Sequence, residues 1–163
     1  MKIRQTTFPA DSARLKETIR EYITWLDMDL SYRGFDQEMA AFDDLFTLPS
    51  GLFLVAEQEG GEIAGCIGLL RHDSATAEVK RLYVRPAFRG LQLGEQLVNA
   101  LTARASQLGY VRLVLDAVPQ TVVAQKLYHA IGFQETAPYY ANPVPGTRFF
   151  ALDLTTHTRK ALV

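Results

Sequence analysis

The stretch that decides the fold runs from Val79 to Val98 and reads VKRLYVRPAFRGLQLGEQLV. A strand-like apolar segment ends at Val84, a turn rich in arginine and glycine follows, and apolar residues then recur at helical spacing. The N-terminus of a helix exposes backbone N–H groups without partners and carries partial positive charge, so it suits a phosphate group. We therefore expect an anionic ligand at this turn. A plain connection between strand and helix is the alternative that these residues leave open.

Two familiar phosphate-binding loops do not match this turn. The nucleotide-triphosphatase loop ends in Gly-Lys-Ser/Thr, whereas Gly94 is followed by Glu95 and Gln96. The dinucleotide fingerprint needs two glycines one residue apart and a third glycine three residues later. Gly90 and Gly94 are too far apart for the first pair, and position 97 is leucine.

The rest of the chain alternates between strand and helix patterns. Before the deciding stretch, we expect a strand at 2–7, a helix from Asp11 with apolar spacing to Leu30, a helix at 36–46 and a hairpin at 52–72. The stretch itself contains a strand at 77–84 and a helix at 91–107. After it we expect a strand at 111–118, a helix at 121–132 and a last strand pair near 133–137 and 147–154. This order predicts an α/β (or α+β) fold with a mixed sheet.

Composition narrows the class of protein. The 163 residues fit one domain, 1–163. Seventeen basic and eighteen acidic residues leave a net charge of −1, which weighs against a nucleic-acid partner. The lone Cys66 is expected to be a small buried residue. The N-terminus has no apolar run, and no window approaches the roughly 18 apolar residues of a membrane span. We expect no membrane partner, and the cytoplasm is the default location.

The deciding stretch resembles the acyl-CoA-binding motif of the GNAT superfamily of N-acetyltransferases. That motif is Arg or Gln, two residues, Gly, one residue, then Gly or Ala. Arg89 and Gly94 match its ends, while Gln92 stands at the middle glycine, where a negative φ would let it offer its backbone N–H. A second stretch, AQKLYHAIGF (124–133), resembles a later helix of the family, whose leading Asn falls on Thr121. The resemblance covers about residues 52–137. It implies a GNAT-like central sheet of about six to seven strands flanked by about four helices.

The resemblance implies transfer of an acetyl group from acetyl-CoA, as co-substrate, to a primary amine that attacks the thioester directly, without a metal. It places the pantetheine chain beside the strand end and the pyrophosphate on the turn. The expected cofactor contacts are Leu82, Tyr83, Val84, Arg89, Gly90, Leu91, Gln92, Leu93, Gly94, Glu95, Thr121 and Tyr128. Lys80, Arg81 and Arg85 could also meet the phosphates, although we favour a solvated strand face for Lys80 and Arg81.

Tyr128 is the expected general acid, since the family's matching tyrosine points its hydroxyl at the thioester sulfur. Glu78 is the candidate general base, because several family members carry a glutamate at the matching place. Asp116, His72 and a water chain are the alternatives. Strict alternation puts Glu78, Lys80, Leu82 and Val84 on one face, unless a bulge intervenes.

The acceptor is less well defined. Tyr139, Tyr140 and Asn142, in the loop-like PYYANPVPG, are the expected substrate contacts. Tyr22, Trp25, Tyr32 and Phe35 are further aromatic candidates, for which packing is the more common role. A small-molecule amine, an amino acid and a protein N-terminus all remain open as acceptors. For the oligomeric state, a homodimer remains open. Two other classes also stay open: a catalytically silent acyl-CoA-binding sensor, and an unrelated nucleotide-binding α/β domain.

Overall fold

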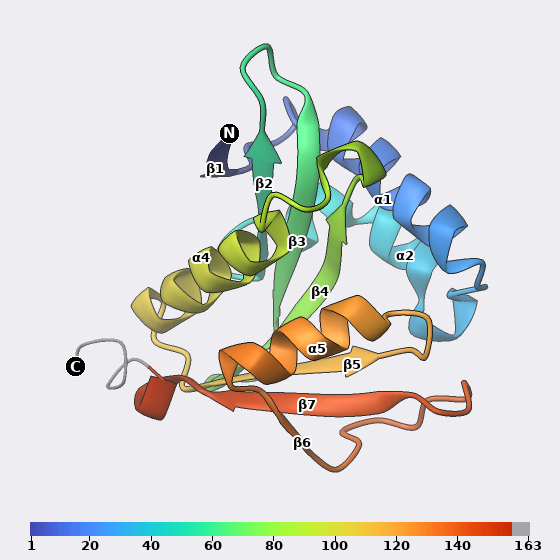
Figure 1. The fold of residues 1–163 in the computed structure, drawn as a ribbon, viewed down its shortest axis with the longest axis vertical. Coiled ribbons are helices and arrows are strands. Elements are labelled where there is room, and N and C mark those ends of the chain that lie inside the picture. The colour runs from blue at the N-terminus through green and yellow to red at the C-terminus, as the bar shows by residue number, and fades with distance from the viewer. Residues whose placement is uncertain (158–163) are drawn as a thin grey trace.

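A computed structural model describes residues 1–157, apart from the side chain of Tyr32. Within these residues the strands form one seven-stranded sheet in the order β1-β2-β3-β4-β5-β7-β6 (Figure 1). Neighbouring strands pair antiparallel except β4 and β5, which are parallel. The strands are β1 (Lys2–Gln5), β2 (Gly51–Glu57), β3 (Ile63–Arg71), β4 (Thr76–Val84), β5 (Arg112–Ala117), β6 (Gln134–Glu135) and β7 (Arg148–Asp153). The predicted α/β fold with a mixed sheet is confirmed.

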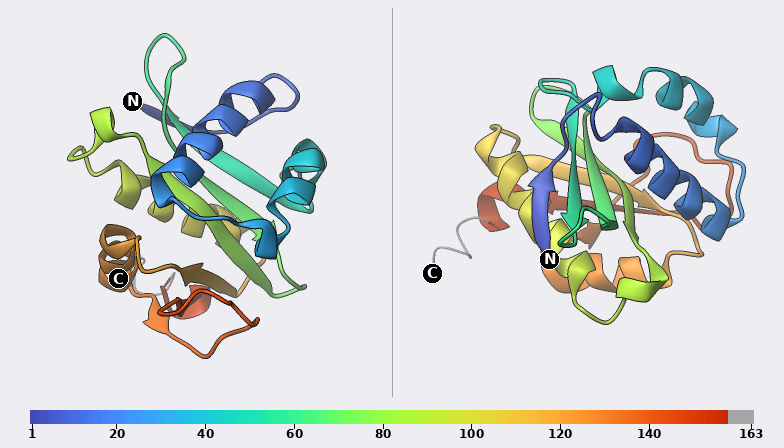
Figure 2. Two further views of the ribbon diagram at one scale, coloured as in Figure 1. Left: turned by 90° about the vertical axis from the view of Figure 1, so that its right-hand side faces the viewer. Right: turned by 90° about the horizontal axis from the view of Figure 1, so that it is seen from above.

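Helices cover both faces of the sheet (Figure 2). On one face lie α1 (Ser12–Leu26), η1 (Ser31–Arg33), α2 (Phe35–Ala40) and α3 (Phe42–Leu45). On the other lie α4 (Leu93–Gln107), which follows the short η2 (Pro86–Phe88), and α5 (Val122–Ile131). Each face has its own apolar core, and the buried Cys66 belongs to the one under α1. No helix within residues 1–157 is long and apolar enough to cross a membrane.

Three predicted helix boundaries are corrected. The first helix ends at Leu26 and not near Leu30, because Asp27 takes a left-handed backbone conformation with φ 53°. The helix predicted over 36–46 is two short helices that meet at Ala41. The helix predicted to start at 91 begins at Leu93, because Gln92 is also left-handed, with φ 59°.

A bulge changes the direction of side chains in the middle of β4. Cys66 of β3 faces Tyr83, while Gly68 faces Lys80, so β4 contains one extra residue between these two pairs. Arg81 lies in this extra length and has φ 56°. Strict alternation along β4 is therefore wrong.

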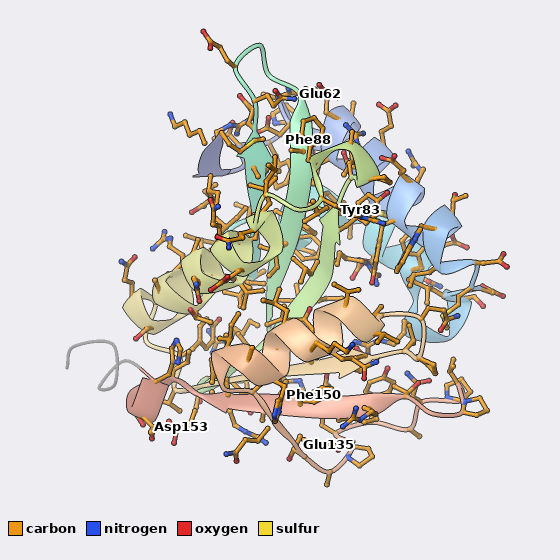
Figure 3. All side chains as sticks on the ribbon, in the orientation of Figure 1. Glu62, Tyr83, Phe88, Glu135, Phe150 and Asp153 are labelled. Carbon is orange, nitrogen blue, oxygen red and sulfur yellow. The ribbon has the colours of Figure 1, made fainter. Side chains whose placement is uncertain are left out.

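The bulge determines which residues share a face. Before it, Glu78 and Lys80 lie on the face covered by α1 and α2, where they pair with Arg33 and Glu38. After it, Tyr83 joins that face, whereas Leu82 and Val84 pack against the core under α4. Figure 3 labels Tyr83 at this end of β4, toward α1.

The parallel pair β4 and β5 separates after a short ladder. Its register runs from Thr76, opposite Arg112, to Glu78, opposite Val114. Beyond that point β5 runs across the view while β4 continues upward (Figure 1). Within the described part of the chain, the edge of β4 from Val79 to Val84 therefore has no strand partner on the β5 side. The divergence of β4 and β5 leaves room for the groove that is described in the next subsection.

Candidate active site

A groove of about 490 Å³ lies between the end of β4, the turn into α4 and the N-terminal half of α5. Most of the predicted cofactor contacts line it: Leu82, Tyr83, Val84, Arg89, Gly90, Gln92, Leu93, Gly94, Glu95 and Thr121. Leu91 is exposed and does not line the groove. Tyr128 lines a neighbouring cavity instead.

The turn into α4 has the backbone that glycine favours, although one of its residues is glutamine. Gly90 has φ 85° and Gln92 has φ 59°, so the negative φ under which Gln92 would offer its backbone N–H is not present. An L residue adopts this left-handed conformation at a cost that glycine avoids. Gly94 has a different reason for being small. A Cβ added there would lie 3.2 Å from Cδ2 of Leu127, so Gly94 lets α4 and α5 approach closely.

The two arginines of the turn are both anchored, in different places. Arg89 donates from Nε to the carbonyl oxygen of Val84 at 3.1 Å, and its guanidinium lies 5.6 Å from the ring centre of Trp25. Both Arg89 and Trp25 line the groove. Arg85 instead bonds Glu21 at 2.7 Å and does not line it.

Lys80 and Arg81 form a buried ion-pair cluster with Glu38. Nζ of Lys80 lies 2.5 Å from Oε1 of Glu38, and Nη2 of Arg81 lies 2.6 Å from Oε2. Burial lowers the pKa of Lys80, and the charge of Arg81 adds to this. Burial would raise the pKa of Glu38, but the two cations outweigh it and lower that pKa. A solvated strand face is therefore wrong for Lys80 and Arg81, because α2 carries Glu38 over β4.

Tyr128 lines a second, smaller cavity of about 70 Å³, next to the groove. Tyr22, Leu82, Thr121 and Ala124 belong to the walls of both spaces. Tyr128 is 6% exposed, and among the described residues its hydroxyl has no hydrogen-bond partner. Burial raises the pKa of Tyr128, with smaller contributions from Tyr22 and Asp116, so the phenol keeps its proton at neutral pH.

The two candidate carboxylates, Glu78 and Asp116, each accept a hydrogen bond from one tyrosine of the loop after β6. Glu78 accepts from Nη2 of Arg33 at 2.7 Å and from the hydroxyl of Tyr139. Asp116 accepts from the hydroxyl of Tyr140 and, at 3.3 Å, from Nδ2 of Asn142. Asp116 lines the small cavity, whereas Glu78 does not.

The predicted acceptor contacts thus lie beside the carboxylates. Burial raises the pKa values of Tyr139 and Tyr140, with Glu78 acting on the first and Asp116 on the second, so both phenols remain donors. Neither tyrosine lines the groove or the small cavity, and Asn142 does not either.

The other aromatic and histidine candidates are dispersed. Tyr22 lines both spaces and Trp25 lines the groove. The ring centre of Phe35 lies 5.3 Å from Cζ of the Arg81 guanidinium. His72 is exposed, with its ring 5.6 Å from that of Tyr139. The side chain of Tyr32 lies outside the described part of the structure.

Sequence reasoning missed Arg33 and Glu38, which pair with residues of β4. Arg33 bonds Glu78, and its guanidinium also lies 4.2 Å from the ring centre of Tyr140. Burial opposes the charge of Arg33, but Glu78 and Asp116 overcome this and raise its pKa. Within residues 1–157, no group of three or more His, Cys, Asp or Glu side chains is placed to hold a metal ion.

Known proteins share this architecture over nearly the whole chain. An uncharacterised N-acetyltransferase of Schizosaccharomyces pombe is 35% identical over 156 residues, which cover 95% of this chain and 96% of that protein. A Klebsiella pneumoniae protein described as an acyl-CoA N-acyltransferase has 28% identity and a TM-score of 0.76, over 94% of this chain and 97% of its own. A Salmonella typhimurium protein described as an acetyltransferase, solved with its cofactor acetyl-CoA, has 25% identity and a TM-score of 0.71, over 94% of each chain.

The family comparison points the same way as these relatives. Residues 19–133 match the acetyltransferase (GNAT) family. The predicted enzyme class, an acetyl-CoA-dependent acyltransferase, is confirmed. The chain belongs to the acetyltransferase (GNAT) family.

Proposed function

We propose that this protein transfers an acetyl group from acetyl-CoA to the primary amine of a small molecule, with Tyr128 as the general acid. One observation carries the proposal. The side chain of Tyr128 is buried, its hydroxyl makes no hydrogen bond to the described residues, and Tyr128 lines a cavity that shares walls with the groove. A proton donor therefore stands where the reacting end of a ligand in the groove would arrive.

The groove fits the co-substrate in size and in the groups it offers. Its volume of about 490 Å³ is in the range of ligand sites. The free edge of β4 from Leu82 to Val84 can pair with the amide-containing pantetheine chain as an added strand would. The turn from Arg89 to Glu95 leads into the 15-residue helix α4, whose N-terminal N–H groups suit a pyrophosphate. Acetyl-CoA supplies the acyl thioester.

The residues around the small cavity supply the remaining chemistry. A carboxylate takes the proton of the acceptor's ammonium, and the amine nitrogen then bonds to the acyl carbon. A backbone N–H near Leu82 to Val84 donates to the developing oxyanion. As the carbon–sulfur bond breaks, Tyr128 donates its proton to the departing sulfur, and the nitrogen passes its second proton to the resulting phenolate, directly or through water. Burial raises the pKa of Tyr128 above its ordinary value near 10, so the phenol still carries the proton at neutral pH when the sulfur departs.

The proton acceptor is one of two carboxylates, and the geometry favours Asp116. Asp116 lines the cavity that Tyr128 lines. Glu78, the candidate from its position on β4, accepts from Arg33 and from the hydroxyl of Tyr139 and does not line that cavity. Either carboxylate could also act through a water molecule.

Thiol release from acetyl-CoA, measured across a broad panel of amines, tests the proposal. We expect amine-dependent thiol release and a rise in Tm on adding acetyl-CoA, because acetyl-CoA binds only the folded protein. A rise in Tm without release for any amine would identify a silent acyl-CoA-binding protein. Stronger stabilisation by ATP or a dinucleotide than by acetyl-CoA would point to an unrelated nucleotide-binding domain.

A further inference from the structure

We propose that the acceptor carries a carboxylate beside its amine, as a free α-amino acid does, and that Arg81 binds this carboxylate in the small cavity. This inference rests on the proposed acetyl transfer and narrows its substrate class.

The first support is an unpartnered donor. The side chain of Arg81 is 9% exposed, and it lines the small cavity. Its Nη2 bonds Glu38, but Nε is buried without a partner, and it is the only such buried side-chain nitrogen or oxygen in the described part of the chain. Buried donors are nearly always hydrogen-bonded in native proteins, so an unpaired donor in a side chain that belongs to the cavity wall calls for a ligand acceptor.

The second support is the distribution of charge around the cavity. Lys80 and Arg81 share the single carboxylate of Glu38, so the end of the cavity beside these two residues has one positive charge in excess. Glu78 balances Arg33. At the end of β5, Asp116 has only neutral donors, Tyr140 and Asn142, so that end has one negative charge in excess.

A zwitterionic acceptor complements this pattern. Its ammonium would pair with Asp116, and its carboxylate would pair with Arg81, whose planar fork of N–H donors matches a carboxylate. A simple alkylamine, or the N-terminus of a protein, would leave the positive end without a counter-charge. A polyamine would add positive charge to it.

The size of the cavity agrees with a small headgroup. A buried water needs about 10–15 Å³ of such volume, so a cavity of about 70 Å³ holds on the order of five groups of that size. An amine, a central carbon and a carboxylate together are about that large.

The test compares each L-amino acid with its own amide, which keeps the amine and the side chain but lacks the negative charge. Thiol release from acetyl-CoA is measured at equal concentrations of unprotonated amine, because the amide group lowers the pKa of the neighbouring amine. For the preferred side chain we expect kcat/KM for the acid to exceed that for the amide at least tenfold. We also expect the acid, and not the amide, to raise the Tm of the protein saturated with coenzyme A.

A matched pair of arginine variants assigns this preference to one residue. Arg81→Lys keeps a cation for Glu38 but removes Nε and the planar fork, and it should reduce the acid-to-amide ratio to less than about threefold. Arg85→Lys, four residues along the chain, changes an arginine that lines neither space and should leave the ratio as in the wild type. The comparison of acid with amide in the wild type needs no variant to fold.

The outcomes separate this inference from the proposed function. Amides acetylated as well as acids, or a ratio that Arg81→Lys does not change, would overturn the carboxylate site while acetyl transfer stands. If none of the amines supported thiol release, the proposed function itself would be wrong. In that case, stabilisation of the coenzyme A complex by acids and not by amides would still support the carboxylate site, and its absence would overturn it.

Discussion

The hydroxyl of Tyr140 donates a hydrogen bond to Oδ2 of Asp116, and Asn142 donates to the same oxygen at 3.3 Å. The other oxygen, Oδ1, accepts no hydrogen bond within the described residues, and Asp116 lines the cavity of Tyr128. The loop after β6 therefore fixes the carboxylate by one oxygen and leaves the other for a ligand. This arrangement suits a group that receives a proton.

Asp116→Asn should lower kcat by roughly 10²–10⁴-fold, because the amide keeps the size and the bond from Tyr140 but cannot accept a proton. Binding of acetyl-CoA, measured by calorimetry, should be retained. Glu78→Gln is the matched control on the other carboxylate, and it should cost less activity than Asp116→Asn. The reverse order of the two losses would make Glu78 the base, and small losses in both variants would leave the proton to water.

Tyr128→Phe should lower kcat at least roughly tenfold while the Kd for acetyl-CoA changes less than about threefold. The ring and its packing remain, and only the proton donor is lost. Burial raises the pKa of Tyr128 above its ordinary value near 10, so the wild-type phenol stays protonated as the pH rises. The kcat of the wild type should therefore show no loss from ionisation of Tyr128 up to about pH 10. Equal turnover by the variant and the wild type would exclude the acid role.

The sequence signals that proved reliable are local ones. The strand ending at Val84, the glycine-containing turn and the apolar spacing from Leu93 each depend on a few neighbouring residues, so the turn into α4 could be predicted. The helix that carries Tyr128 could be predicted in the same way.

The parts that could not be predicted depend on pairing between distant segments. Arg33 and Glu78 are 45 residues apart in the chain, and Lys80 and Glu38 are 42 apart. No periodicity links such positions, so a lysine and an arginine on a strand resembled a solvated face. The bulge at Arg81 depends on the register between β3 and β4, which alternation in one strand cannot reveal.

Gly94→Glu should abolish the rise in Tm that acetyl-CoA produces. The new side chain brings bulk and negative charge to the first turn of α4, where the pyrophosphate is proposed to bind. Gly94→Ala is the uncharged control. Its Cβ would lie 3.2 Å from a flexible methyl group of Leu127, which can shift slightly, so most of the rise should persist. An undiminished rise in the glutamate variant would place the anion elsewhere.

Gln92→Gly should stabilise the folded protein by about 0.5–1 kcal/mol, measured by urea unfolding. The left-handed conformation costs an L residue about 1–2 kcal/mol, and glycine avoids this cost. The greater freedom of glycine stabilises the unfolded chain and offsets only part of that stabilisation of the folded protein. Gln92 is exposed and makes no side-chain capping bond to α4, so little else is lost. Gly90→Ala is the converse control. Its added Cβ meets nothing within 4 Å, yet φ of 85° should make it destabilising. A destabilised Gln92→Gly variant would mean that the glutamine side chain has a role of its own.

Asp11 should make the stability of the protein sensitive to acid. Arg4 binds both oxygens of this buried carboxylate at 2.8 Å, and the backbone N–H of Thr7 donates to it at 2.7 Å. The bonds from Arg4 hold the pKa of Asp11 well below its usual range, and Thr7 adds to the effect. Because the folded-state pKa is the lower one, the unfolded chain binds the proton first. The contribution of Asp11 is then fully present above the unfolded value of about 3.9 and is lost as the pH falls through the folded value.

Urea unfolding of the wild type and of Asp11→Asn between about pH 7 and pH 3 measures this contribution. The variant should be less stable at neutral pH and should lose less stability on acidification. Arg4→Gln removes the main cause of the lowered pKa, so it should flatten the same pH dependence, and the double variant should show little further change. If the wild type and Asp11→Asn lost stability in parallel as the pH fell, the acid sensitivity of the fold would lie with other carboxylates.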